Sequence, residues 1–124
     1  MWELTKSFRF EAAHSIAGTT LGAAGAGVHG HSFRAEVTIR GTPDPATGMV
    51  MDLGRLDQSL DTLRRSLDHK WLNDVAGLGA PTLENLARYI WERVESPGAL
   101  ARVTVHRDSL NEAATYLGPQ APAR

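Results

Sequence analysis

The segment VHGHSF, residues 28–33, contains two histidines separated by one glycine. If it begins a β-strand, His29 and His31 point to the same face, because side chains alternate along a strand. A third histidine, His14, reaches the same end of the sheet if the strand before it pairs antiparallel. Three neutral imidazoles suit Zn²⁺ and leave a fourth position open, as in catalytic zinc sites. An HxH pattern also fits an ordinary solvated strand, so the spacing alone leaves both interpretations open.

Two strands are predicted to carry these histidines. Apolar and polar residues alternate from Trp2 to His14, and alternation resumes from His31 to Arg40, which is the period of a strand. The Gly- and Ala-rich segment from Ser15 to Val28 has neither a strand nor a helix period. We therefore expect a loop between two antiparallel strands.

Two amphipathic helices follow, each after a residue that can cap its N-terminus. Asp52 precedes the first helix and Thr82 precedes the second. The apolar residues recur at helical spacing: Leu53, Leu56, Leu60, Leu63 and Leu67 in the first helix, then Leu83, Leu86, Ala87, Ile90 and Val94 in the second. Val103 and Val105 indicate a third strand, and residues 113–117 a fourth.

The order of elements predicts an α+β fold. Strand, strand, helix, helix, strand, strand (ββααββ) is typical of a four-stranded antiparallel sheet with two helices on one face. We expect one domain over residues 1–118 and a frayed tail over 119–124. An open sheet has two exposed edges, and small domains often cover them with neighbouring subunits. We therefore expect a homo-oligomer.

Composition narrows the partners. The 124 residues are 42% hydrophobic, carry a formal net charge of −1 and include no cysteine. This balance gives no electrostatic case for nucleic acid or an anionic membrane as the partner, and disulfides and thiolate metal sites are excluded. No apolar run approaches the length of a membrane span. We expect a cytoplasmic protein whose partner is a small molecule.

Five segments extend the histidine pattern along nearly the whole chain. They are FRFEAAHSI, VHGHSF, TGMVMDL, LDHKWLN and PTLENLARYIWERV. Their order and spacing resemble the 6-pyruvoyltetrahydropterin synthase and 6-carboxytetrahydropterin synthase family. The resemblance implies the tunnelling fold (T-fold), whose subunits join their sheets into a trimeric barrel and usually stack as a hexamer. It also implies Zn²⁺ held by His14, His29 and His31, and a lyase that acts on a dihydroneopterin triphosphate-like pterin.

The resemblance also implies roles for four residues near the helices. Asp68 and His69 match the acid and the histidine of the family's proton-transfer triad, in which the carboxylate orients the imidazole. Without the resemblance they fit a helix end and its following loop. Thr82 and Glu84 match part of the pterin pocket, and both can also act as helix cap and first-turn acid.

The last strand of the family carries a glutamate that binds the amidine-like edge of the pterin. Counting back from Tyr116 gives Asp108 at this place, whereas counting forward from Val103 and Val105 gives Arg107. A basic residue would repel that edge, so Asp108 is the predicted pterin ligand.

One departure concerns the chemistry. Gly25 stands where the family has the cysteine of the triad, and the chain has no cysteine elsewhere. A general base contributes roughly two to four orders of magnitude in rate. Two hypotheses follow: a zinc-dependent enzyme that acts on a dihydropterin side chain by proton transfer and elimination or carbon–carbon cleavage, or a catalytically impaired pterin- or purine-binding homologue.

Overall fold

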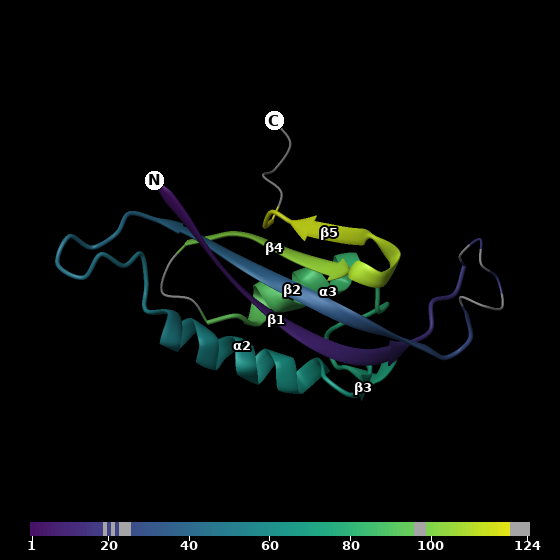
Figure 1. The fold of residues 1–124 in the computed structure, drawn as a ribbon. Helices are drawn as coiled ribbons and strands as arrows, with labels where there is room; N and C mark the ends of the chain where they lie inside the picture. The colour runs from purple at the N-terminus through teal and green to yellow at the C-terminus, as the bar shows by residue number, and fades with distance from the viewer. Residues whose placement is uncertain (19, 21, 23–25, 96–98, 120–124) are drawn as a thin grey trace.

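A computed structural model describes residues 1–18, 20, 22, 26–95 and 99–119 (Figure 1). Its main elements are β1 (Trp2–His14), β2 (His29–Gly41), α2 (Leu53–Leu67), β3 (Lys70–Trp71), α3 (Leu83–Arg93), β4 (Ala99–Arg107) and β5 (Glu112–Tyr116). Two 3₁₀ turns, η1 (Leu72–Asp74) and η2 (Asp108–Leu110), follow β3 and β4. Gly25 and residues 120–124 of the predicted tail lie outside the described residues.

The strands form one sheet in the order β3-β1-β2-β4-β5. β1 and β2 pair antiparallel over their whole length, from Trp2 opposite Gly41 to His14 opposite His29. β4 and β5 continue the antiparallel pairing, whereas β3 pairs parallel with β1. The α+β prediction is confirmed, but the sheet has five strands and is mixed. The prediction of four antiparallel strands missed β3, because two residues are too few to show a period.

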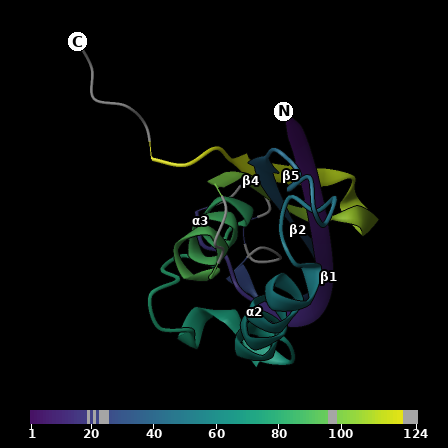
Figure 2. The same cartoon turned by 90° about the vertical axis from the view of Figure 1, so that its left-hand side faces the viewer.

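Both helices cover one face of this sheet (Figures 1 and 2). α2 packs against β1, and α3 packs against β4 and β5. The helices begin where the sequence predicted: the Asp52 side chain accepts a hydrogen bond from Gly54 N, and the Thr82 side chain accepts one from Asn85 N. Cap residues of this kind satisfy backbone N–H groups that lack a partner in the first turn.

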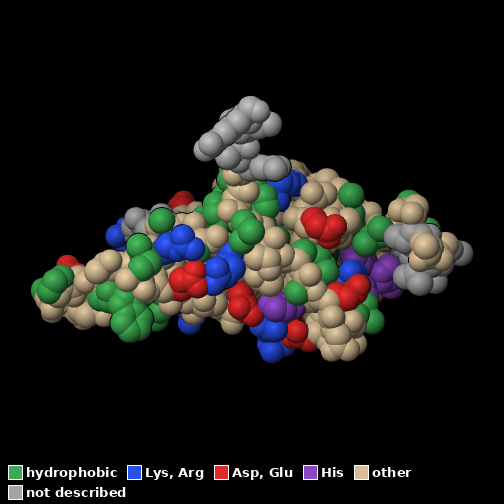
Figure 3. All heavy atoms as spheres, turned by 90° about the horizontal axis from the view of Figure 1, so that it is seen from above, with side chains coloured by type: hydrophobic (Ala, Val, Ile, Leu, Met, Phe, Trp, Pro, Cys, Tyr) green, Lys and Arg blue, Asp and Glu red, His purple; other side chains and the backbone are tan. Residues whose placement is uncertain are grey.

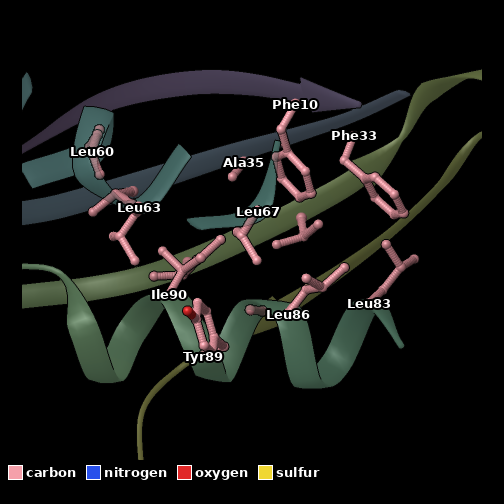
Figure 4. Packing of buried hydrophobic residues seen from close by; sticks show 14 of the residues in the cluster. Phe10, Phe33, Ala35, Leu60, Leu63, Leu67, Leu83, Leu86, Tyr89 and Ile90 are labelled. Carbon is pink, nitrogen blue, oxygen red and sulfur yellow. The ribbon is translucent and has the colours of Figure 1, made fainter. Parts of the chain in front are cut away.

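The core lies between the sheet and the two helices. Its fully buried side chains come from alternate residues of the strands and from one stripe of each helix, and include Phe10, Phe33, Val37, Ile39, Leu56, Leu60, Leu67, Leu86 and Ile90. Figure 4 shows the stripe of α3 pointing toward Phe10 and Phe33. The rings of these two phenylalanines stack at 5.0 Å between centroids. This pair lies at the end of the core that is nearest to the histidines of β1 and β2.

The opposite face of the sheet is polar. Alternate residues of β1 and β2 project there, and Arg34 binds Asp108 and Glu36 while His106 Nε2 lies 2.9 Å from Glu36. In the view of Figure 3, basic and acidic side chains are mixed rather than gathered by sign. Within the described residues, neither helix has the length and apolar character needed to cross a membrane.

The cap of α2 gives a first test. Replacing Asp52 with Ala removes the acceptor that lies 2.8 Å from Gly54 N and should lower the free energy of unfolding by about 1 kcal/mol. Asp57→Ala is the matched control, because its carboxylate makes an exposed 3.5 Å ion pair with Lys6 and should contribute about 0.5 kcal/mol or less. Urea unfolding at one fixed protein concentration measures both. Equal losses in the two variants would contradict the assigned cap.

Candidate metal centre

The paired ends of β1 and β2 bring three histidines together. His14 is the direct partner of His29 across the strands, and His31 follows two residues along β2 on the same face. The ring centroids lie 4.5 Å apart for His14 and His29 and 4.9 Å apart for the other two pairs. One ligand atom from each ring lies within 4.8 Å of the others. Small side-chain movements would let one ion contact all three.

The hydrogen bonds of the imidazoles leave ring nitrogens available for a metal. His14 Nδ1 lies 2.9 Å from the carbonyl of Pro81, and His29 Nδ1 lies 2.9 Å from that of Gly27. A carbonyl only accepts, so each Nδ1 carries the proton and each Nε2 keeps its lone pair. Within the described residues, the buried Nε2 atoms of His14 and His31 have no hydrogen-bond partner. Buried polar atoms are normally satisfied, so this donor set fits a Zn²⁺ ion and its orienting carbonyls.

Burial keeps the imidazoles of His14 and His31 neutral. It is the main cause that lowers the pKa of His31 to about 4, and repulsion of the protonated ring by His14 and Arg107 adds to it. Burial also lowers the pKa of His14, which is fully inaccessible to solvent, although its bond to Pro81 acts in the opposite direction. Neutral imidazole is the form that binds a metal. At pH 7 both His14 and His31 are therefore in the metal-binding form.

Asp68 and His69 lie where α2 ends and β3 begins. Asp68 caps the C-terminus of α2, accepts a 2.8 Å hydrogen bond from Glu11 N and pairs with Arg64 at 3.2 Å. Its Oδ2 lies 3.7 Å from Nε2 of His69, whose side chain is 80% exposed. His69 has a positive φ of 57°, an uncommon conformation for a residue other than glycine.

An open cavity of about 530 Å³ lies between β3 and the paired ends of β1 and β2. Both His31 and His69 line it, together with Glu11, Ser32 and Trp71. His31 of the candidate metal centre and the exposed His69 thus line the same cavity. One residue predicted for metal binding and one predicted for proton transfer therefore adjoin the same cavity.

The N-terminus of α3 also adjoins the metal centre. Pro81, whose carbonyl accepts from His14, directly precedes the helix cap Thr82. Thr82 is half-buried and its hydroxyl is engaged by Asn85 N at 3.1 Å, whereas Glu84 is exposed in the first turn. Their roles in substrate binding stay predictions, and Thr82 has a structural role in any case.

Asp108 lies on the polar face of the sheet, not on the face of His14, His29 and His31. Its carboxylate accepts two hydrogen bonds from Arg34, at 2.9 and 3.1 Å, and lies 3.8 Å from Arg9. The hydrogen bond from Arg34 is the main cause that lowers the pKa of Asp108. Arg34 belongs to the polar face of β2, because it lies between the buried residues Phe33 and Ala35. Binding of a pterin by Asp108 stays a prediction, and it would require the carboxylate to leave Arg34.

Sequence reasoning missed two groups near the histidines. The carbonyl of Pro81 has no signal in residue types, because any residue could supply it. Glu112 pairs with Arg107 across the β4–β5 hairpin and contributes to the electrostatic surroundings of His31. The hairpin register could have indicated Glu112, but it required knowledge of where η2 interrupts the strands.

The fold and the site together define a class of protein. Two helices on one face of a five-stranded mixed sheet, with three converging histidines at its end, describe an α+β T-fold protein with a candidate metal centre. The chain belongs to the 6-pyruvoyl tetrahydropterin synthase family, whose model matches residues 3–119.

Named relatives agree with this membership. The chain is 37% identical to a 6-carboxy-5,6,7,8-tetrahydropterin synthase of Synechocystis, over 97% of this chain and 96% of the relative. It is 39% identical to human 6-pyruvoyl tetrahydrobiopterin synthase, over 67% of this chain and 62% of the relative. The solved structure of Caenorhabditis elegans 6-pyruvoyl tetrahydropterin synthase superposes with a TM-score of 0.82 at 27% identity, over 95% of this chain and 96% of that one.

Removing one histidine should abolish tight metal binding. We expect about one zinc ion per chain in the wild type after dialysis and little in His29→Ala, since two imidazoles hold zinc far more weakly than three. His106→Ala is the control, because His106 pairs with Glu36 on the other face. Elemental analysis of the dialysed proteins measures the occupancy. Equal zinc in wild type and His29→Ala would contradict the site.

Stability of the metal-free protein should depend on pH through His31. Its folded pKa of about 4 lies below the ordinary value of 6.5, so between these values the unfolded chain binds more protons. The free energy of unfolding should therefore fall as pH drops from about 6.5 to about 4, and stay level for this group above about 6.5. His14 acts in the same direction. Urea titrations with a chelator present should give a shallower decline for His31→Asn, and equal slopes would contradict it.

Proposed function

We propose that this chain is a zinc-dependent lyase of its family that acts on the side chain of a dihydropterin by proton transfer and elimination or carbon–carbon cleavage. The convergence of three imidazoles with available Nε2 atoms carries the proposal. Family membership and the cavity shared by His31 and His69 support it. His14, His29 and His31 would hold the ion, and when bound Zn²⁺ supplies Lewis-acid polarisation of oxygens on the substrate side chain.

The protein's own proton carrier in this proposal is His69. Its exposed ring lines the cavity. There it can accept a proton from one atom of the pterin side chain and donate it to another atom of that side chain. Asp68 supports this by stabilising the protonated ring, since its Oδ2 lies 3.7 Å away. The carboxylate is itself fixed by Glu11 N and Arg64. In this proposal His69 is the acid and base, and Asp68 acts on it as a fixed neighbouring charge.

The missing cysteine limits the rate. Gly25 supplies no side chain that could act as a base, so His69 must carry the proton steps that the family divides between two groups. A lost general base costs roughly two to four orders of magnitude. The same glycine favours the second candidate function, a pterin- or purine-binding homologue whose catalysis is impaired.

Ring binding is proposed for residues beside the metal centre. Thr82 and Glu84 begin α3 directly after Pro81, and the N-terminus of a helix offers N–H groups to a polar heterocycle. Asp108 contributes only if its carboxylate exchanges Arg34 for the ligand. We also propose that the chain forms a homo-oligomer, a trimer or a hexamer, because β3 and β5 form the two edges of the sheet. We propose a cytoplasmic location as well.

His69→Ala separates catalysis from binding. Zinc-loaded wild type and variant are incubated with dihydroneopterin triphosphate and with dihydroneopterin, and products are followed by mass spectrometry. We expect kcat to fall by roughly two to four orders of magnitude in the variant with little change in pterin affinity. His106→Ala should keep both.

The same measurements distinguish the two candidate functions. Pterin binding without turnover in the wild type would establish the binding homologue in place of the enzyme. Neither binding nor turnover would contradict both. Turnover that survives in His69→Ala would remove His69 from the mechanism.

A further inference from the structure

Arg107 belongs to the histidine side of the sheet. It is the last residue of β4, in which Val103 and Val105 are fully buried, so alternation places Arg107 on that same face. It lies one residue beyond the pair formed by Arg34 and His106, and Asp108 follows with its carboxylate on Arg34. Arg107 and Asp108, the two residues given by counting along the sequence, therefore lie on opposite faces of the sheet.

Arg107 lies beside Phe33 when the β2–β4 register is continued from the pair before it, two residues along β2 from His31. Its positive charge is among the causes that lower the pKa of both His14 and His31. The side chain is only 16% exposed. Its buried Nε has no hydrogen-bond partner within the described residues. A guanidinium that is mostly buried with an unpaired donor is costly unless something completes its hydrogen bonds.

Glu112 satisfies one part of this guanidinium. Its Oε1 lies 3.2 Å from Nη2 of Arg107, directly across the hairpin. The carboxylate is 48% exposed, so it sits at the solvent side and leaves Nε unpaired. The imidazoles of His14 and His31 beside it are neutral. Glu112 therefore balances the charge of Arg107 but leaves its Nε donor without a partner in the described part of the chain. A bound divalent ion would add positive charge next to this donor.

We propose that Arg107 is a specificity residue that binds an oxyanion of the ligand, a carboxylate or a phosphate, beside the three histidines. The guanidinium offers parallel N–H groups that match an oxyanion in a bidentate arrangement. Glu112 holds the guanidinium in position and competes with the ligand for it. The inference rests on the proposed pterin site and narrows its substrate to a pterin with an acidic group.

Two matched pterins test the charge preference. Pterin-6-carboxylate and 6-hydroxymethylpterin differ at one substituent, and their own fluorescence reports binding to metal-free and to zinc-loaded protein. The wild type should bind the carboxylate about ten- to a hundredfold more tightly, the usual effect of a charge-assisted hydrogen bond. Equal affinity, or a preference for the neutral pterin, would overturn the proposal.

Three variants assign that preference to Arg107. Arg107→Gln should lose the preference for the carboxylate. Arg107→Lys should keep only part of it, because an ammonium lacks the parallel N–H groups of the guanidinium. Arg102→Gln should keep the whole preference. Arg102 is the matched control on β4, since it pairs with Glu3 on another part of the sheet. A preference that persists in folded Arg107→Gln would overturn the proposal.

Glu112→Gln gives a result of opposite sign. If the carboxylate competes with the ligand, the variant should bind pterin-6-carboxylate more tightly. If Glu112 instead reads the N–H edge of the ring and Arg107 only positions it, the variant should bind both pterins more weakly, which would overturn the proposal. This measurement still decides the matter if Arg107→Gln fails to fold.

Inorganic phosphate separates this inference from the proposed function. If neither pterin binds, the pterin function fails, and equilibrium dialysis against labelled phosphate then tests Arg107 alone. Saturable phosphate binding that is lost in Arg107→Gln would support an oxyanion site for another substrate. Absence of saturable binding in the wild type would overturn the oxyanion site as well.

Discussion

The unbroken antiparallel register of β1 and β2 is the constraint on which the site depends. It sets His14 opposite His29 and leaves His31 on the same face as the core residue Phe33. A shift of one residue would turn a whole strand to the other face. The same register therefore buries the phenylalanines and gathers the imidazoles, so the hydrophobic effect that stabilises the core also assembles the ligands.

The helices complete what the strands begin. α3 starts at a cap, Thr82, and the preceding carbonyl of Pro81 accepts from His14. α2 ends at Asp68, whose carboxylate binds Glu11 N of β1. Each helix thus contributes through a terminus, where backbone groups and capping side chains are free to make tertiary hydrogen bonds. Packing of the helices on the sheet fixes both termini relative to the histidines.

Elements with a strong period were predictable from the sequence, and those without one were not. β1 and α2 appear at the predicted bounds, and α3 ends one residue before Val94, because their apolar residues repeat over many positions. β3 has two residues and forms only because β1 offers an edge. The three histidines could be placed on one face by alternation, but their orienting carbonyls could not. Counting along the sequence gave two different residues, Arg107 and Asp108, because η2 interrupts the hairpin and breaks the count.

That interruption decides the electrostatics of the site. At the end of β4 an arginine and an aspartate are adjacent, and the pleat sends one toward each face of the sheet. Asp108 meets Arg34 and Arg9 on the polar face, while Arg107 meets Glu112 beside the histidines. Each charge has a partner on its own face, so exchanging the two residues would leave like charges opposed on both. The charged partners on each face therefore determine that a ligand beside the histidines meets Arg107 and not Asp108.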